Sequence, residues 1–264
     1  MRFTMTCATA LLACAAVPHA TTAREPEKAE ASKAYVPKPY LDANAMPDPA
    51  RYLPPPPAAG TPAYAADRQA YESALAGKGG RAWQRAIGQA SVRSPEVQRQ
   101  IMCALGAKVD LTPASALGRL MARSGLTLSA ASERSKAIWK RDRPYVGEAG
   151  AVTCDPDANF GSQSPSYPSG HGAIGWMWGL MLAELAPDRS NELLAWGAEL
   201  GDNRVACRVH YPSDIAAGRT MGAALLARLH GDAGFRADME AARAEISAAR
   251  QRGARPDCAA DQAM

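Results

Sequence analysis

The sequence YPSGH at residues 167–171 leads almost directly into the apolar run AIGWMWGLML at residues 173–182. The run is long enough for a buried helix, and the turn before it is typical of a helix start with Ser169 as the N-cap. Unpaired backbone N–H groups and the helix dipole attract anions at such a start. The stretch therefore indicates a buried helix with His171 beside a phosphate-sized anion site, although by itself the pattern is more typical of plain capping.

Two other polar stretches carry the residue types that such a site needs. The sequence KAIWKRDRP occupies residues 136–144, and NRVACRVHYPSD occupies residues 203–214. Phosphate oxygens are bound by cationic side chains, Arg as a planar fork and Lys as a point charge. Any one of these cations alone is more typical of a solvated surface, but the three stretches together favour a shared anion site.

The three stretches, in this order, resemble the signature of the phosphatidic acid phosphatase type 2 superfamily. That signature is Lys, six residues and Arg-Pro, then Pro-Ser-Gly-His, then Ser-Arg, five residues, His, three residues and Asp. The matching positions are Lys136, Arg143, Pro144, Pro168, Ser169, Gly170, His171, Arg204, His210 and Asp214. One position departs, because Asn203 stands where the family has Ser, and Asn keeps hydrogen-bonding capacity there.

The resemblance implies a role for each matching side chain. His210 would be the nucleophile that forms a phosphohistidine, and Asp214, four residues on, would fix its tautomer. His171 would be the general acid for the leaving alkoxide and then the base for water. The groups expected to bind the phosphate are Lys136, Arg143, Ser169, Gly170 and Arg204.

The N-terminus has the pattern of a signal peptide. Met1-Arg2 supplies positive charge, an apolar stretch runs through Val17, and small residues surround the expected cleavage points after Ala20 or Ala23. A lipoprotein cleavage before Cys14 is the second choice. The apolar run is shorter than the about 20 residues that span a bilayer. We therefore expect a signal peptide at residues 1–23, no integral membrane segment after cleavage, and a periplasmic or secreted protein.

Four cysteines follow the signal peptide: Cys103, Cys154, Cys207 and Cys258. An even number in an oxidising compartment predicts two disulfides, for which the sequence alone allows three pairings. A metal site is disfavoured, because no Cys-x-x-Cys occurs and few histidines remain. Members of the resembled family have similar cysteines at the places of Cys154 and Cys207, which implies that pair and leaves Cys103 with Cys258.

The rest of the chain has helical periodicity, without strand alternation or repeats. Residues 24–50 are polar and aperiodic, which predicts a loosely ordered leader, and residues 253–264 would form a C-terminal tail. The run LPPPP at residues 53–57 resembles the one that precedes the first core helix of secreted bacterial acid phosphatases. Helices are expected at about 61–76, 82–90, 95–105, 112–123, 129–143, 171–187, 189–200, 214–229 and 233–251, with a break near Ser124-Gly125 and a cap at Ser213.

These patterns predict an all-α fold, a single-domain helical bundle of the acid phosphatase/vanadium haloperoxidase type over residues 51–252. The chain has 264 residues, of which 47% are hydrophobic, which is enough for one large core. The formal net charge of +4 suits an anionic substrate, and no Lys/Arg block is long enough to indicate nucleic acid.

The resemblance implies an acid phosphatase of the class A bacterial type, acting on small-molecule phosphate monoesters without a metal or other cofactor. Such sites can also pass the phosphoryl group to an alcohol. One alternative is a vanadium-dependent haloperoxidase, which shares the same cradle of cations. Another is a catalytically dead anion-binding protein, against which the intact His-Asp pair argues. The sequence leaves open whether the protein forms a homo-oligomer.

Overall fold

The computed structural model describes residues 35–155 and 164–259. From Tyr35 onward the chain is one unit with its own core. The predicted signal peptide, its cleavage points, Cys14 and the last residues of the expected tail lie outside the described residues.

The described residues form helices and no strands, which confirms the all-α prediction. None of these helices is both long enough and apolar enough to cross a membrane. The main helices are α1 (Pro62–Ser73), α2 (Arg81–Gly88), α3 (Pro95–Leu105), α4 (Ala116–Trp139), α6 (Gly170–Leu185), α7 (Ser190–Ala206), α8 (Pro212–Leu229) and α9 (Ala233–Gln251). Short 3-10 turns lie at Pro49–Arg51, Ala74–Gly77 and Pro187–Arg189.

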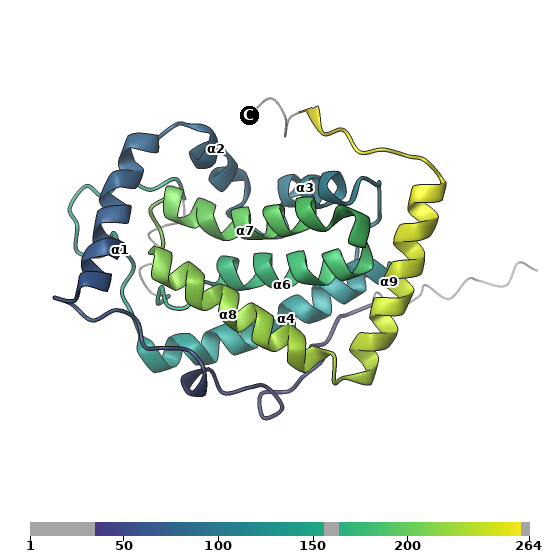
Figure 1. Cartoon of the computed structure of the whole chain (residues 1–264), viewed down its shortest axis with the longest axis horizontal. Coiled ribbons are helices and arrows are strands. Elements are labelled where there is room, and N and C mark those ends of the chain that lie inside the picture. The colour runs from purple at the N-terminus through teal and green to yellow at the C-terminus, as the bar shows by residue number, and fades with distance from the viewer. Residues whose placement is uncertain (1–34, 156–163, 260–264) are drawn as a thin grey trace, which may run out of the picture. The chain divides into compact units, whose positions relative to one another are not determined.

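Helix α6 is the centre of the bundle, between α7 and α8 and against α4 (Figure 1). Glycines let these helices approach backbone to backbone. A Cβ on Gly175 would lie 2.6 Å from the carbonyl oxygen of Gly197, and one on Gly218 would lie 2.5 Å from that of Ser169. The close packing brings the start of α6, the end of α7 and the start of α8 to one end of the bundle, beside α1 and α2.

Helix α4 corrects the prediction of two helices with a break near Ser124-Gly125. The helix is continuous and begins after the cap Ser115, not at Thr112. The Ser124 hydroxyl accepts a hydrogen bond of 3.1 Å from Trp178 Nε1. A Cβ on Gly125 would lie 3.3 Å from the same indole ring. The small residues that suggested a break instead make room for Trp178 of α6.

The C-terminal end of α4 also differs from the prediction. The helix ends at Trp139, and Lys140 takes a left-handed conformation with φ of 47°. Arg141 and Arg143 therefore lie in the loop that follows, whereas the periodicity predicted a helix up to Pro144. This early end frees both arginines to turn inward.

The segment expected to be a loosely ordered leader packs onto the core from Tyr40 onward. Leu41 and Met46 are buried. The backbone N–H of Tyr40 donates to Thr127 Oγ1 at 2.9 Å, and its hydroxyl donates to Asp238 Oδ2 at 2.6 Å. Buried apolar side chains among the polar ones hold this stretch, so the leader prediction is wrong for these residues.

Two disulfides join Cys103 to Cys258 and Cys154 to Cys207, which are the pairs that the resemblance implied. The second bridge ties the loop after α4 to the end of α7. A backbone hydrogen bond of 3.2 Å from Cys154 N to the Cys207 carbonyl reinforces it. The bridge therefore fixes the loop close to Arg204, three residues before Cys207.

Candidate active site

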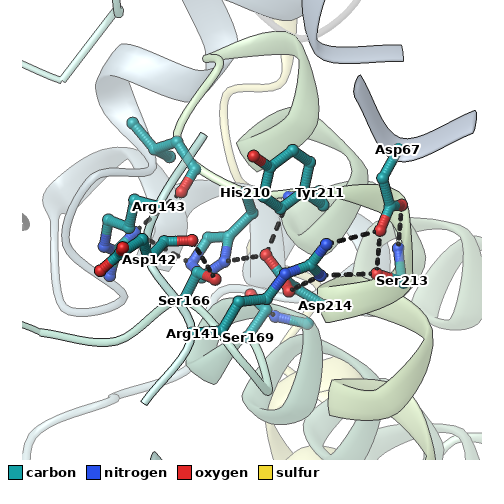
Figure 2. A network of polar contacts seen from close by, with 12 residues as sticks. Asp67, Arg141, Asp142, Arg143, Ser166, Ser169, His210, Tyr211, Ser213 and Asp214 are labelled. Carbon is teal, nitrogen blue, oxygen red and sulfur yellow. Dashed lines mark hydrogen bonds and ion pairs between the residues drawn. The ribbon is translucent and has the colours of Figure 1, made fainter. Parts of the chain in front are cut away.

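The three polar stretches meet at the end of the bundle where α6 starts. Lys136 comes from the last turn of α4, and Arg143 from the loop after it. His171 lies in the first turn of α6, Arg204 in the last turn of α7, and His210 just before α8. Residues far apart in sequence thus share one region of the molecule. Figure 2 shows the part of this region around His210, with Arg143, Ser169 and Asp214.

His210 and Asp214 form a buried pair, with exposed fractions of 3% and 0%. The two residues lie one helical turn apart, and His210 Nδ1 is 3.2 Å from Asp214 Oδ2. That carboxylate oxygen also accepts the backbone N–H of Tyr211 at 2.9 Å, which fixes the start of α8. Because Nδ1–H donates to the carboxylate, the lone pair of the neutral ring lies on Nε2.

Arg141 compensates the charge of this buried carboxylate. Burial raises the pKa of Asp214, and the positive charge of Arg141 acts against that rise. The Arg141 Nη1 donates to Asp214 Oδ1 at 2.6 Å and to the Ser213 hydroxyl at 2.7 Å. Ser213 was predicted to cap α8, but the helix starts after Tyr211, and the hydroxyl serves this network instead.

His171 is oriented by the chain after α2. Its Nε2 lies 3.1 Å from the carbonyl oxygen of Gln89 and 3.2 Å from that of Ala90. Both partners are acceptors, so Nε2 carries the hydrogen and the lone pair of the neutral ring lies on Nδ1. Burial lowers the pKa of His171 well below its usual value, and the charges of Arg204 and His210 lower it further.

Lys136 and Arg143 are held by one short segment. Lys136 Nζ donates to the Ser164 hydroxyl at 2.9 Å, and Arg143 Nε donates to the Ser164 carbonyl at 3.0 Å. Arg143 Nη1 donates to the Val209 carbonyl at 3.0 Å and lies 3.2 Å from His210 Nε2. Both cations line a pocket of about 340 Å³. Neither His171 nor His210 lines that pocket, so the pocket lies beside the two histidines.

Arg204 is buried, with an exposed fraction of 3%. Its Nη2 pairs with Asp155 Oδ2 at 2.7 Å, and its Nη1 donates to the Ala86 carbonyl at 3.3 Å. Burial lowers the pKa of Lys136, of Arg143 and of Arg204. Three buried positive charges repel one another, and a dianion bound among them would compensate that repulsion.

Ser169 and Gly170 start α6 as the sequence indicated. The Ser169 side chain is the N-cap and accepts the backbone N–H of Gly172 at 3.1 Å. The Ser169 backbone N–H donates to the Asp214 carbonyl at 2.9 Å, which ties this turn to α8. The Gly170 N–H is one of the first-turn donors for which an α-helix has no acceptor of its own.

Comparison with known proteins identifies the family of this chain. Residues 114–236 match the PAP2 superfamily. The chain is 38% identical to an acid phosphatase of Zymomonas mobilis over 210 residues, which is 80% of each chain. The chain belongs to the PAP2 superfamily. It is also 37% identical to a non-specific acid phosphatase of Salmonella typhimurium over 201 residues, 74% of this chain and 79% of that one. A non-specific acid phosphatase of Providencia stuartii is 30% identical over 210 residues, 79% of this chain and 84% of that one.

Several residues that complete the site could not be found from the PAP2 superfamily signature. Arg141 lies inside the first stretch and was expected in its helix, but it matches no position of the signature. Asp67, Gln89 and Asp155 belong to none of the three stretches, and only the packing of distant segments brings them to the site. Ser164 precedes the Pro-Ser-Gly-His turn closely, which is a weak signal at most.

Asn203, the one departure from the superfamily signature, contacts the segment that orients His171. Its Nδ2 donates to Gln89 Oε1 at 2.8 Å, and Glu199 Oε1 lies 3.2 Å away. Gln89 is fully buried and donates through Nε2 to Gln100 Oε1 at 2.9 Å. The Asn amide therefore joins α7 to the residue whose carbonyl contacts His171.

The Asn203→Ser variant, which restores the superfamily residue, should lower both stability and turnover modestly. Serine has a shorter side chain without an amide, so the bond to Gln89 is lost at a cost of about 1 kcal/mol. We expect kcat to fall by less than about tenfold because the His171 contacts are backbone ones. Urea unfolding and steady-state kinetics measure the two effects. Asn191→Ser, at an exposed position of the same helix, is the control, and equal behaviour of the two variants would contradict the expectation.

Proposed function

We propose that the protein is a periplasmic or secreted acid phosphatase that hydrolyses phosphate monoesters through a phosphohistidine on His210. The observation that carries the proposal is the position of His210. Its Nδ1 is 3.2 Å from the buried Asp214, and its Nε2 is 3.2 Å from Arg143. A ring with one nitrogen held by a carboxylate and the other facing a cation is suited to attack a phosphoryl group bound by that cation.

In the first step, the lone pair of His210 Nε2 attacks phosphorus while the ester P–O bond breaks. The oxygens of the phosphoryl group are bound by Lys136, Arg143 and Arg204, with the Gly170 N–H as a further donor. The leaving alkoxide takes a proton from Nδ1 of the His171 imidazolium. The products of this step are an alcohol and a phosphohistidine.

In the second step, neutral His171 takes a proton from water, and the water oxygen attacks phosphorus. The P–N bond to His210 breaks, which releases orthophosphate and restores the free imidazole. An alcohol in place of water would give phosphotransfer by the same step. Neither step uses a metal ion.

The pH dependence follows from the two histidines. Burial lowers the pKa of both His171 and His210, and Arg143 and Arg204 lower that of His210 further. The lowered pKa extends the pH range in which His210 is neutral, and therefore nucleophilic, to lower pH than for a free histidine. His171 must be protonated for the first step, and because its pKa is lowered too, that form is lost at lower pH than for a free histidine as pH rises. We expect kcat/KM to be at least about tenfold higher near pH 5 than near pH 8. A pH–rate profile with p-nitrophenyl phosphate measures this, and a flat profile would contradict it.

A panel of phosphate esters assayed with and without EDTA tests the reaction class. We expect equal turnover in both conditions, because the proposed steps need only protein side chains. Loss of turnover with EDTA would refute the metal-free mechanism. Bromide oxidation by the vanadate-loaded protein without ester hydrolysis would indicate a haloperoxidase instead. Phosphate binding without any turnover would indicate an anion-binding protein.

A further inference from the structure

Asp67 of α1 lies outside the three stretches and before the part of the chain that matches the PAP2 superfamily, yet it is part of the polar network behind His210. Its exposed fraction is 4%. Its Oδ2 accepts Arg141 Nη2 at 2.8 Å, and its Oδ1 accepts the backbone N–H of Ser213 at 3.1 Å. The Ser213 hydroxyl also donates to Asp67. The carboxylate therefore contacts both the loop after α4 and the first turn of α8.

Arg141 links Asp67 to Asp214 through the two ends of its fork. Nη2 points to Asp67, and Nη1 points to Asp214 and to Ser213. The guanidinium carbon also lies 4.1 Å from the centroid of the Tyr211 ring. Asp67, Arg141, Asp214 and His210 thus form a continuous chain of contacts, shown in Figure 2, in which the cation Arg141 lies between two carboxylates and the second carboxylate contacts the imidazole.

This order of charges determines how strongly Asp214 can act on His210. A buried guanidinium paired with only one carboxylate attracts the negative charge of that carboxylate strongly. The carboxylate is then a weaker acceptor for the hydrogen bond from the imidazole N–H. When a second carboxylate pairs with the other end of the guanidinium, the attraction of the cation is divided between the two carboxylates. The second carboxylate also fixes the fork, because two acceptors and a stacked ring leave Arg141 one orientation.

We propose that Asp67 is a positioning residue for the nucleophile: through Arg141 it keeps Asp214 placed and charged to hold His210. The proposal rests on His210 being the nucleophile of the proposed function. Asp67 contacts none of Lys136, Arg143 or Arg204 among the described contacts, so its effect falls on the chemical step and leaves phosphate binding unchanged.

The test is the Asp67→Asn variant of the full chain, assayed for kcat, KM and inhibition by orthophosphate. The amide keeps the shape and one acceptor oxygen but removes the charge. We expect kcat to fall about ten- to a hundredfold, with KM and the inhibition constant for orthophosphate changed by less than about twofold. Asp67→Glu, which keeps the charge, should recover part of kcat. An unchanged kcat, or a rise in KM alone, would overturn the proposal.

Asp238→Asn is the matched control for a loss of stability. Asp238 is also a buried aspartate between two arginines, since it pairs with Arg119 and Arg123 at 2.9 Å each, but it lies on α9. We expect this variant to lose stability while kcat is retained. An equal loss of kcat in both variants would show a general structural effect and overturn the proposal.

Misfolding of Asp67→Asn and failure of the proposed function can each be distinguished from failure of this inference. If Asp67→Asn does not fold, Ser213→Ala removes only the hydroxyl between Asp67 and Arg141, and it should lower kcat by about two- to tenfold at constant KM; constant kcat there overturns the proposal. If the wild type has no ester hydrolysis, the proposed function itself fails, whereas wild-type turnover with full kcat in Asp67→Asn overturns this inference alone.

Discussion

Replacing His210 with alanine is expected to reduce kcat for p-nitrophenyl phosphate by at least about 10³-fold. The variant has no atom in the place of Nε2 to form the bond to phosphorus, and the cations that bind the phosphoryl group remain. Orthophosphate should therefore still inhibit or bind. Rapid acid-free quenching of the wild type with a radiolabelled ester should trap a phosphoenzyme, and the variant should give none.

His230→Ala is the control for this experiment. His230 is exposed and pairs with Glu184, so its loss should leave kcat unchanged. A His210→Ala variant that keeps wild-type turnover, or that still forms a phosphoenzyme, would assign the nucleophile to another residue. The reading of His171 as acid and base would then lose its partner as well.

Replacing Arg143 with alanine is expected to lower kcat/KM by about 10²- to 10³-fold with little loss of stability. Arg143 faces Nε2 of His210 and donates to two backbone carbonyls, of Ser164 and Val209. Its removal costs those hydrogen bonds, about 1 kcal/mol each. Burial lowers the pKa of Arg143, which means that the folded state disfavours its charge. Relief of that penalty should offset the lost bonds.

The combination of the two measurements distinguishes a binding cation from a structural one. The free energy of unfolding of Arg143→Ala, measured by heat or urea, should be close to that of the wild type, while kcat/KM falls by the amount given above. Arg208→Ala is the informative comparison. Arg208 is buried more deeply than Arg143, with an exposed fraction of 3%, and donates to the carbonyls of Tyr71 and Val152. It lies in none of the proposed catalytic contacts, so it should lose stability more than turnover. The reverse result for the two arginines would refute the assignment of Arg143.

Local spacing explains what the sequence could predict of this molecule. A cap, a four-residue interval and a periodic apolar face act within one helix, so Ser169 as the cap, the reach from His210 to Asp214, and the bounds of α9 follow from neighbouring residues. Long-range packing explains the rest. Gly125 has a low helix propensity, but the indole of Trp178 packs into the space that a side chain at this position would occupy.

Parts of the site could not be predicted from the sequence, because they also depend on long-range packing. The carbonyls of Gln89 and Ala90 contact His171 only because α2 ends against α7, and any residue type has a carbonyl. Asp67 resembles an ordinary polar residue of an amphipathic helix until α1 is placed against α8. Tyr40 is surrounded by polar and proline residues that hide its place in the core.

The glycine contacts of α6 limit how this protein can be redesigned. Where Gly175 meets Gly197 and Gly218 meets Ser169, two main chains touch, and no side chain separates them that a library could vary. Randomising these positions should mostly yield insoluble variants, whatever ester is selected for. A search for new substrates is better confined to exposed positions of the loop after α4, such as residues 146–150, which lie outside the proposed catalytic contacts and away from the central helices.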